Sequence, residues 1–304
     1  MRIMITGASG FVGRQVVSSL VRRGVDVIAV SRRPPGADRQ VTWLQADLLS
    51  EESVATVAAV RPDIIVHLAW IVEHGKFWTS PLNLAWVAAS LRLAQAAAET
   101  GVKRFVTTGT CYEYAWPEDS DCEENATPIV PSTVYGVSKD ATRRVLSAYF
   151  DERGLSFAWA RLFFLYGPGE GPNRLVPSIC RALVAEKPAP CSRGLVVRDF
   201  MDVRDAGSAI ADVALSPVTG DINIAASEAV SIADVAQKLG HIAGRPDLIR
   251  LGELPDRVGE PPRITATGTR LRKTTGFRPS FTLDMGLADA IQYWRNNRPE
   301  DASA

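Results

Sequence analysis

A tyrosine and a lysine four positions apart are well suited to proton transfer. Tyr135 and Lys139 lie in a segment whose pattern predicts a helix near residues 132–152, so their side chains share one helix face. A free tyrosine has a pKa of about 10, and a neighbouring ammonium group favours its ionised form. The pair is predicted to act as an acid–base unit, although a lone Tyr-x-x-x-Lys spacing is usually just two exposed residues.

Three glycines near the start of the chain predict a binding place for a dinucleotide. Gly7, Gly10 and Gly13 follow the apolar run Ile3-Met4-Ile5 and precede a helical pattern. A strand, a tight turn and a helix N-terminus together receive a pyrophosphate, because free N–H groups bind negative charge and a Cβ would block the phosphate. The predicted NAD(P) contacts in this turn are Gly7, Ser9, Gly10, Phe11, Val12 and Gly13.

The spacing of the turn, Gly-x-x-Gly-x-x-Gly, differs from the general Gly-x-Gly-x-x-Gly fingerprint. Together with Tyr135-Gly136-Val137-Ser138-Lys139, it resembles the extended short-chain dehydrogenases/reductases, the NAD(P)-dependent sugar-nucleotide epimerase/dehydratase/ketoreductase family. The resemblance runs from Arg2 to about Trp294. It implies an enzyme with a nicotinamide cofactor and a nucleoside-diphosphate sugar as its substrate.

The resemblance also implies roles for individual residues. Thr110 would hydrogen-bond the oxygen at the reacting sugar carbon, Tyr135 would transfer the proton, and Lys139 would also contact the nicotinamide ribose. Arg198 and Arg257 would bind the diphosphate, and Asn173 and Leu175 the nucleotide base. The implied cofactor contacts outside the glycine turn are Asp47, Leu48, Leu68, Ala69, Tyr135 and Lys139. His67, beside Leu68, is equally well explained as a core histidine.

The end of the second predicted strand bears on the choice of cofactor. An NAD site has an acidic residue here for the ribose 2′-OH, whereas an NADP site has a small residue and arginines for the 2′-phosphate. This chain has Ser31, Arg32 and Arg33. A guanidinium binds a phosphate through two parallel hydrogen bonds, so NADP(H) is the predicted cofactor, with NAD(H) as the alternative. The two arginines could also be solvated residues before a turn.

Comparison with the family's motifs narrows the reaction. Cys111 and Tyr112 stand where the dehydratases have their acid pair, which disfavours dehydration, and Phe164 replaces an asparagine common in epimerases. Glu113 receives no role. The predicted activity is NADPH-dependent reduction of a nucleoside-diphosphate 4-keto(-6-deoxy)hexose at C4. The alternatives are an NAD(P)-dependent sugar-nucleotide 4-epimerase and a non-catalytic NADP-binding sensor, against which Tyr135 and Lys139 argue.

Apolar runs that alternate with amphipathic patterns predict a doubly wound α/β fold with a parallel sheet, the Rossmann arrangement. Residues 1–165 would form the NAD(P)-binding domain and 166–304 mainly a smaller substrate-binding lobe, with segments near 203–225 returning to the first domain. Residues from Pro299 onward would form a frayed tail. The expected strands are 2–6, 25–31, 41–46, 63–68, 102–108 and 155–162, and the expected helices lie near 11–23, 51–60, 82–99 and 132–152.

Composition limits the partners. The 304 residues include 34 basic and 34 acidic side chains, which favours neither nucleic acid nor an anionic membrane as a partner. Neither a membrane span nor a signal peptide is evident, so a cytoplasmic location is expected. Four dispersed cysteines predict no metal site and no disulfide framework. A homodimer through helices 82–99 and 132–152 is expected from the resemblance, with an apolar stripe of Ala85, Ala89, Leu93 and Ala96. Ordinary packing against the sheet would also explain this stripe.

Overall fold

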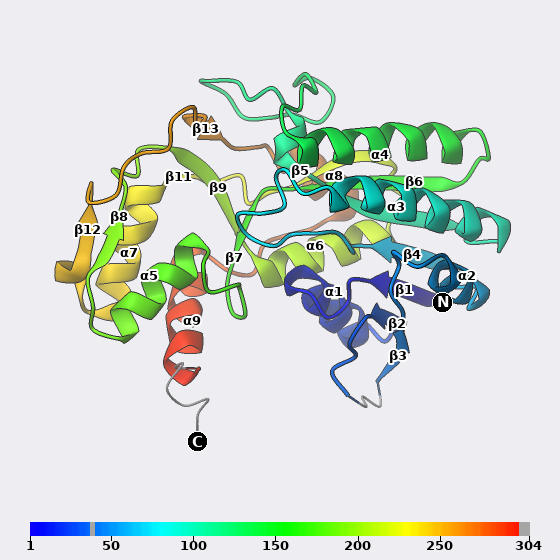
Figure 1. Ribbon diagram of the computed structural model, residues 1–304, viewed down its shortest axis with the longest axis horizontal. Helices are drawn as coiled ribbons and strands as arrows, with labels where there is room; N and C mark the ends of the chain where they lie inside the picture. The colour runs from blue at the N-terminus through cyan, green and yellow to red at the C-terminus, as the bar shows by residue number, and fades with distance from the viewer. Residues whose placement is uncertain (37–39, 298–304) are drawn as a thin grey trace.

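A seven-stranded parallel sheet forms the centre of the molecule (Figure 1). The computed structural model describes residues 1–36 and 40–297, so the tail expected from Pro299 onward lies outside the described residues. The strand order reverses beside β1, which is the doubly wound arrangement that the sequence predicts. In spatial order the strands are β10 (Gly220–Ile224), β6 (Ser156–Leu162), β5 (Arg104–Thr110), β4 (Ile64–His67), β1 (Arg2–Thr6), β2 (Asp26–Ser31) and β3 (Val41–Gln45).

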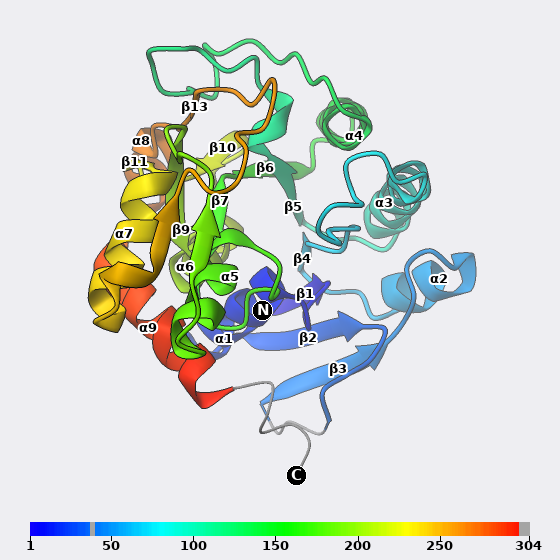
Figure 2. The ribbon, with the colours of Figure 1, turned by 60° about the vertical axis from the view of Figure 1, so that its left-hand side comes forward.

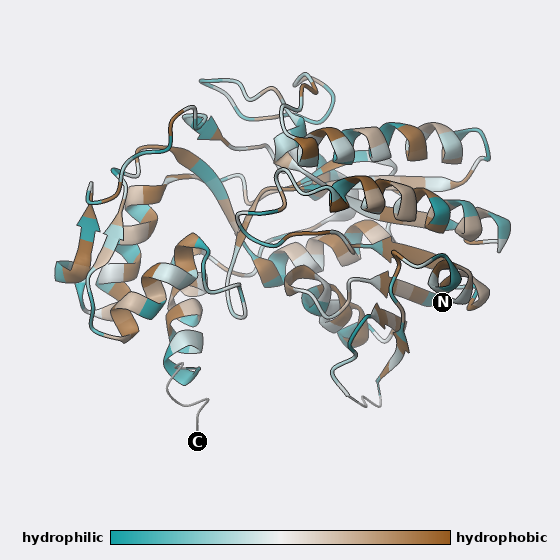
Figure 3. Cartoon of the chain, viewed as in Figure 1, coloured by the Kyte–Doolittle hydropathy of each residue, from teal (hydrophilic) through white to brown (hydrophobic). Residues whose placement is uncertain are grey.

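The strands form where the sequence has short apolar runs. Ile3, Met4 and Ile5 of β1 are fully buried, as are all seven residues of β5 to within a few per cent. Strands covered on both faces read as continuous apolar segments, which is why these runs could be recognised. In Figure 3 the central strands are mainly brown, whereas α3 and α4 alternate between brown and teal along their length.

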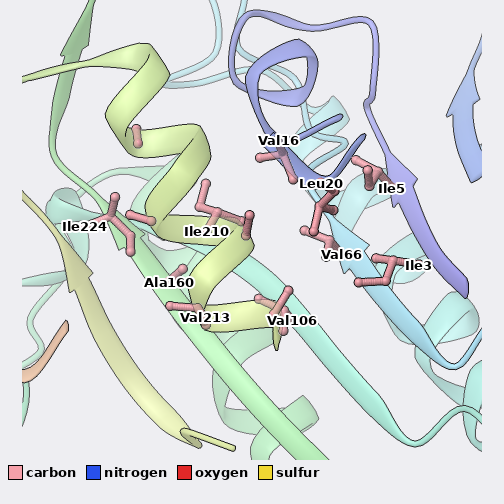
Figure 4. Close-up of a cluster of buried hydrophobic side chains, with 14 of the residues drawn as sticks. Ile3, Ile5, Val16, Leu20, Val66, Val106, Ala160, Ile210, Val213 and Ile224 are labelled. Atoms are coloured by element: carbon pink, nitrogen blue, oxygen red, sulfur yellow. The ribbon is translucent and has the colours of Figure 1, made fainter. Parts of the chain in front are cut away.

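Helices cover both faces of the sheet (Figure 2). On one face, α1 (Phe11–Arg22) packs against α6 (Val203–Leu215), and Gly207 allows the close approach because a Cβ there would lie 2.4 Å from Cβ of Gln15. On the other face lie α2 (Glu51–Ala59), α3 (Leu82–Glu99) and α4 (Val134–Asp151). Figure 4 shows the first of these cores, built from Ile3, Ile5, Val16, Leu20, Val66, Val106, Ala160, Ile210, Val213 and Ile224.

A smaller lobe, at the left of Figure 1, is built mainly from the second half of the chain. Its helices α5 (Leu175–Val184), α7 (Ile232–Ala243) and α9 (Leu283–Asn296) share a separate apolar core. Two short sheets complete it, with β9 at the centre of one of them. The remaining elements are β7 (Phe164–Tyr166), β8 (Ala189–Cys191), β9 (Val197–Asp202), β11 (Ala229–Ser231), β12 (Ile249–Leu251), β13 (Arg263–Ile264) and α8 (Thr269–Thr275), with 3₁₀ turns η1 (Cys111–Glu113) and η2 (Pro246–Leu248).

Two observed boundaries differ from the predicted ones in ways that matter for the site. Strand β5 continues to Thr110 rather than stopping at residue 108, because its last residues pair with β6 up to Leu162. Helix α4 begins at Val134, since Thr133 is its N-cap and accepts the N–H of Gly136 at 3.0 Å. Within residues 1–36 and 40–297, no helix combines the length and the apolar character needed to cross a bilayer.

Candidate active site

The glycine turn between β1 and α1 has the shape of a pyrophosphate cradle. Gly7 has a φ of +68°, and a Cβ on it would lie 2.8 Å from the backbone nitrogen of Ala69. Gly10 is the N-cap residue of α1, so no side chain takes up the first backbone donors of the helix. These N–H groups have no partner within the helix and can bind an anion. The turn therefore fits a dinucleotide pyrophosphate.

At the end of β2, a hydroxyl stands where NAD sites have a carboxylate. Ser31 is buried, and its Oγ lies 2.7 Å from Oγ of Ser9 in the glycine turn. The following residues, Arg32 and Arg33, have exposed side chains. This strand end would attract a 2′-phosphate rather than repel it, because it carries two cations and no acid.

The other predicted cofactor contacts lie at the same edge of the sheet. Asp47 follows β3, and its exposed carboxylate accepts the N–H of Leu49 at 3.1 Å, whereas Leu48 is buried. Leu68 and Ala69 follow β4 and donate their N–H groups to Oγ1 of Thr6 at 3.2 and 3.3 Å. The carboxyl ends of neighbouring parallel strands are where open α/β sheets bind ligands.

His67 is a residue of the core. This is one of the two interpretations that the sequence left open. Its Nδ1 lies 2.7 Å from Oγ1 of Thr6 and its Nε2 lies 2.9 Å from Oγ of Ser90. Burial, with a smaller contribution from the charge of Lys139, lowers the pKa of His67 to about 3. The imidazole is therefore neutral and is held by two hydroxyl groups.

The proposed catalytic residues come together from β5 and α4. Thr110 ends β5, Tyr135 lies in the first turn of α4, and the Thr110 side chain opposes the rise that burial causes in the pKa of Tyr135. Both side chains are buried. The Tyr135 ring packs edge-on against Phe77 and Trp78, with centroid distances of 4.8 and 5.9 Å. The loop after β4 thus supplies an aromatic wall beside the phenol.

Lys139 is held away from solvent one turn further along α4. Its Nζ donates to the carbonyl of Thr108 at 2.9 Å and lies 3.9 Å from the centre of the Trp70 ring. Burial lowers the pKa of Lys139 to about 7 and raises that of Tyr135. The expected lowering of the tyrosine pKa by the ammonium is absent here, because desolvation dominates and Lys139 binds a strand carbonyl.

The lowered pKa of Lys139 has a testable effect on stability. Unfolding restores the ordinary pKa of 10.5, so between pH 7 and pH 10.5 the unfolded chain binds more protons at this residue than the folded chain. Stability at this site therefore rises with pH over that window. In urea unfolding of the cofactor-free protein, we expect the stability of the wild type relative to Lys139→Met to increase from about pH 7 to about pH 9. If the difference in stability between the two proteins stays constant from pH 7 to pH 9, the lowered pKa of Lys139 is contradicted.

Two arginines of the smaller lobe act on Tyr112, a residue beside the site. Arg198 is buried and donates to Glu260 at 2.9 Å, while Arg257 is exposed. Both charges oppose the burial that raises the pKa of Tyr112, the neighbour of Cys111. Asn173 is exposed and Leu175 begins α5, so these two residues lie at the start of a helix in the same lobe.

Sequence analysis missed several residues of this region. Arg174, the N-cap residue of α5, lies 5.8 Å from the Phe77 ring and, after burial, helps to lower the pKa of His74 together with Arg257. Trp78 and Tyr112 form an edge-on pair with centroids 4.5 Å apart. Only tertiary packing brings these residues to Tyr135, so no local pattern in the sequence marks them.

Comparison with known proteins places this site in a family. Residues 3–225 match the NAD dependent epimerase/dehydratase family. The chain belongs to that family. It is 26% identical to the UDP-glucose 4-epimerase of Mycolicibacterium smegmatis over 97% of this chain and 99% of that protein. It is also 26% identical to the dTDP-6-deoxy-L-talose 4-dehydrogenase (NAD(+)) of Aggregatibacter actinomycetemcomitans, over 76% of this chain and 87% of that protein.

A solved structure supports the same placement. The UDP-glucose 4-epimerase of Thermus thermophilus, in complex with NAD, superimposes with a TM-score of 0.86 at 25% identity, covering 97% of this chain and 99% of that one. Family membership confirms the predicted Rossmann fold and identifies the chain as an enzyme of the NAD dependent epimerase/dehydratase family. The family's name states that its members depend on NAD. In this structure, the glycine turn is the part that fits such a dinucleotide.

Proposed function

We propose that this protein is an NAD(P)-dependent 4-epimerase of a nucleoside-diphosphate hexose. The observation that carries the proposal is the buried arrangement of Thr110 and Tyr135, in which Thr110 acts on the Tyr135 phenol, beside buried Lys139 whose Nζ binds the end of β5. Two relatives that align over almost the whole chain are named UDP-glucose 4-epimerases, which supports this activity over one-way reduction.

In this mechanism the bound nicotinamide supplies a reversible hydride acceptor. Tyr135 accepts the proton of the C4 hydroxyl and later returns it to the same oxygen, so the residue ends each cycle unchanged. Thr110 donates a hydrogen bond to that oxygen and stabilises its negative charge. Because burial raises the pKa of Tyr135, the phenol is protonated in the cofactor-free chain, and its ionisation requires added positive charge at the site. Lys139, the lysine of helix α4, would supply part of that charge.

The smaller lobe is the proposed site of the nucleotide. Arg198 and Arg257 would bind the diphosphate, to which we add Arg174, because an anionic substrate is best held by several guanidinium groups. Asn173 and Leu175 would contact the base. This assignment assumes a division of the chain into residues 1–165 and 166–304, with α6 and β10 returning to the first part.

Dehydration is not proposed, because none of the side chains at positions 111–113 is a suitable acid. Cys111 is 2% exposed, and burial raises the pKa of its thiol. Tyr112 likewise has a raised pKa, mainly through burial. The carboxylate of the next residue, Glu113, is fully buried in an ion pair with Arg161. None of these three groups can readily protonate a leaving hydroxyl.

Reduction of a 4-keto(-6-deoxy)hexose by NADPH is the second candidate, and the residues at the end of β2 favour it. An epimerase restores its cofactor in each cycle and gains little from an NADP site, whereas a reductase must exchange NADP for NADPH. Ser31, Arg32 and Arg33 favour such an exchange. The deciding assay offers UDP-, GDP- and dTDP-hexoses and, separately, nucleotide 4-keto-6-deoxy sugars with NADPH. Interconversion of hexoses without net NADPH loss supports the epimerase, and stoichiometric NADPH loss with a ketone supports the reductase.

We propose that NADP(H) binds better than NAD(H), and Arg32 is the residue that tests it. Arg32→Ala removes an exposed guanidinium that only the 2′-phosphate would engage. A hydrogen bond to a charged group contributes about 1.5–3 kcal/mol, so the affinity for NADPH should fall roughly tenfold or more. NADH serves as the internal control in parallel fluorescence titrations. Equal losses for the two cofactors would show that Arg32 does not bind the 2′-phosphate.

A homodimer through α3 and α4 remains our proposal, but part of the expected apolar stripe is wrong. Ala89 and Leu93 are buried against the sheet of the same chain and cannot face a partner. Leu82 and Val134 are exposed at the starts of these helices, and Leu84, Val137 and Val145 are each at least half exposed. They provide the surface for a helix-to-helix contact.

The dimer proposal makes a measurable prediction. Sedimentation at micromolar concentration should give about twice the chain mass of 32.9 kDa. Replacing Val137 and Val145 by aspartate should shift the protein toward the single-chain mass, because two charges would be buried in an apolar contact. A wild-type mass near 32.9 kDa would exclude the dimer under these conditions.

A further inference from the structure

Glu113 lies directly behind the proposed catalytic threonine. It is the last residue of η1, the 3₁₀ turn that Thr110 caps. Its Oε1 accepts the backbone N–H of Thr110 at 2.8 Å, while the N–H of Tyr112 donates to Oγ1 of Thr110 at 3.3 Å. The backbone and the hydroxyl of Thr110 are therefore held from two directions by one short turn.

Two residues of β6 hold the carboxylate of Glu113 in turn. Trp159 donates Nε1–H to the carboxylate at 3.0 Å, and Arg161 donates Nε–H to Oε2 at 2.7 Å. Trp159 and Arg161 are alternate residues of one strand, so their side chains leave the same face. The backbone at Gly109 also packs closely against Glu113, because a Cβ on Gly109 would be 2.4 Å from Oε1 of Glu113.

The hydrogen-bond pattern indicates that Glu113 is ionised. Burial raises the pKa of its carboxyl group, with Arg161 acting in the opposite direction. However, Thr110, Trp159 and Arg161 all present N–H donors to it, and a protonated carboxyl would need an acceptor. The carboxylate with the Arg161 guanidinium is the form that satisfies every one of these groups.

Stability alone does not explain this arrangement. Both charged groups are fully buried, and the desolvation of a buried ion pair often cancels its attraction. A neutral side chain could also accept the N–H of Thr110. The ion pair does provide a fixed acceptor, because Arg161 is itself anchored to Tyr114 Oη at 3.1 Å and to Asp221 at 2.9 Å.

We propose that Glu113 is a positioning residue that acts through Thr110: its carboxylate, held by Arg161 and Trp159, fixes the Thr110 hydroxyl where it meets Tyr135 and the reacting oxygen. The proposal rests on the proposed function for the role of that oxygen. Its structural part, the placement of Thr110 by Glu113, does not depend on which sugar the enzyme accepts.

The variant Glu113→Gln keeps the size of the side chain but presents an amide N–H₂ to groups that are all donors. Small misplacements of catalytic groups are costly, so we expect kcat to fall roughly tenfold or more with little change in KM or in dinucleotide affinity. The matched control is Asp221→Asn, which also removes a carboxylate from Arg161 but has no contact with Thr110. Its kcat should stay within about twofold of the wild type.

A double-mutant cycle separates positioning from a general structural effect. If Glu113 acts through the Thr110 hydroxyl, Glu113→Gln should cost little further kcat in a Thr110→Val background. The same fold-loss in both backgrounds, or a loss in Asp221→Asn equal to that in Glu113→Gln, would overturn the proposal. Should Glu113→Gln fail to fold, Glu113→Asp enters the same cycle, because it keeps the charge for Arg161 and withdraws the carboxylate from Thr110.

A readout without turnover keeps this test separate from the proposed function. In threonine-methyl NMR spectra of the cofactor-free protein, with the Thr110 signal assigned by Thr110→Val, that signal should move in Glu113→Gln and stay in Asp221→Asn. A stationary signal in Glu113→Gln would refute the positioning role even if every sugar nucleotide is turned over. If the Thr110 signal moves but the protein turns over no sugar nucleotide, the placement of Thr110 by Glu113 is supported and only the proposed function is refuted.

Discussion

The Tyr135→Phe variant is expected to lose about 100-fold or more in turnover while it binds dinucleotide nearly as well as the wild type. The substitution removes the transferable proton but keeps the ring, whose edge-on contacts with Phe77 and Trp78 remain. The two quantities are kcat on an accepted nucleotide hexose and the dinucleotide Kd from fluorescence titration. The expected loss is large because this substitution removes the acid–base group itself.

A second tyrosine on the same helix is a matched control. Tyr149 lies near the end of α4, where its ring stacks under Arg153 at 3.8 Å. Tyr149→Phe deletes the same atom and should leave kcat unchanged. If Tyr135→Phe retains wild-type turnover, the assignment of the proton-transfer group is wrong. If it loses dinucleotide binding and turnover together, the phenol is a binding group rather than an acid–base catalyst.

The first half of the fold could be predicted because its information is local. Strands such as β1 and β2 are buried on both faces and appear as short apolar runs, and α3 was expected with the same bounds, 82–99. The glycine turn is equally local, since strand, turn and helix are consecutive in the chain. The strands of the smaller lobe have only two to six residues, which is too short for a periodic pattern to be seen.

The environment of the catalytic residues could not be predicted in the same way. Tyr135 and Lys139 follow a helical spacing, so their shared face was predictable, but the carbonyl that Lys139 binds belongs to a strand 31 residues earlier. The desolvation that dominates both pKa values is a property of packing. In the cofactor-free chain it raises the pKa of Tyr135, and the spacing of Tyr135 and Lys139 gives no sign of this.

The surroundings of Glu113 likewise could not be predicted from the sequence. Its partners Trp159 and Arg161 lie 46 and 48 residues away, and only the register of β5 against β6 brings them to it. A single glutamate between two tyrosines carries no signal of its own that it is buried. Arg174 is similar, since it reaches Phe77 only because α5 of the smaller lobe packs toward the loop after β4.

Substitutions in the glycine turn should separate folding from cofactor binding. In Gly13→Ala, the new Cβ would lie 2.1 Å from the carbonyl oxygen of Gly7 and 2.8 Å from Cα of Ala8, both backbone atoms of the turn. The turn must move to accommodate it, and overpacking of this kind costs about 1–3 kcal/mol or more. We expect a lower thermal midpoint and no rise of that midpoint when NADP or NAD is added, because ligand stabilisation requires binding.

Gly10→Ala should affect binding without a comparable loss of stability. Its Cβ meets only the Gly7 oxygen, at 3.1 Å, and its backbone φ of −73° suits any residue. The methyl group would instead occupy the space in front of the α1 N-terminus, where the pyrophosphate is proposed to lie. Gly171→Ala is the control, because no atom lies within 4 Å of its Cβ. If Gly10→Ala gains as much thermal stability from the dinucleotide as Gly171→Ala does, the pyrophosphate does not bind at this turn.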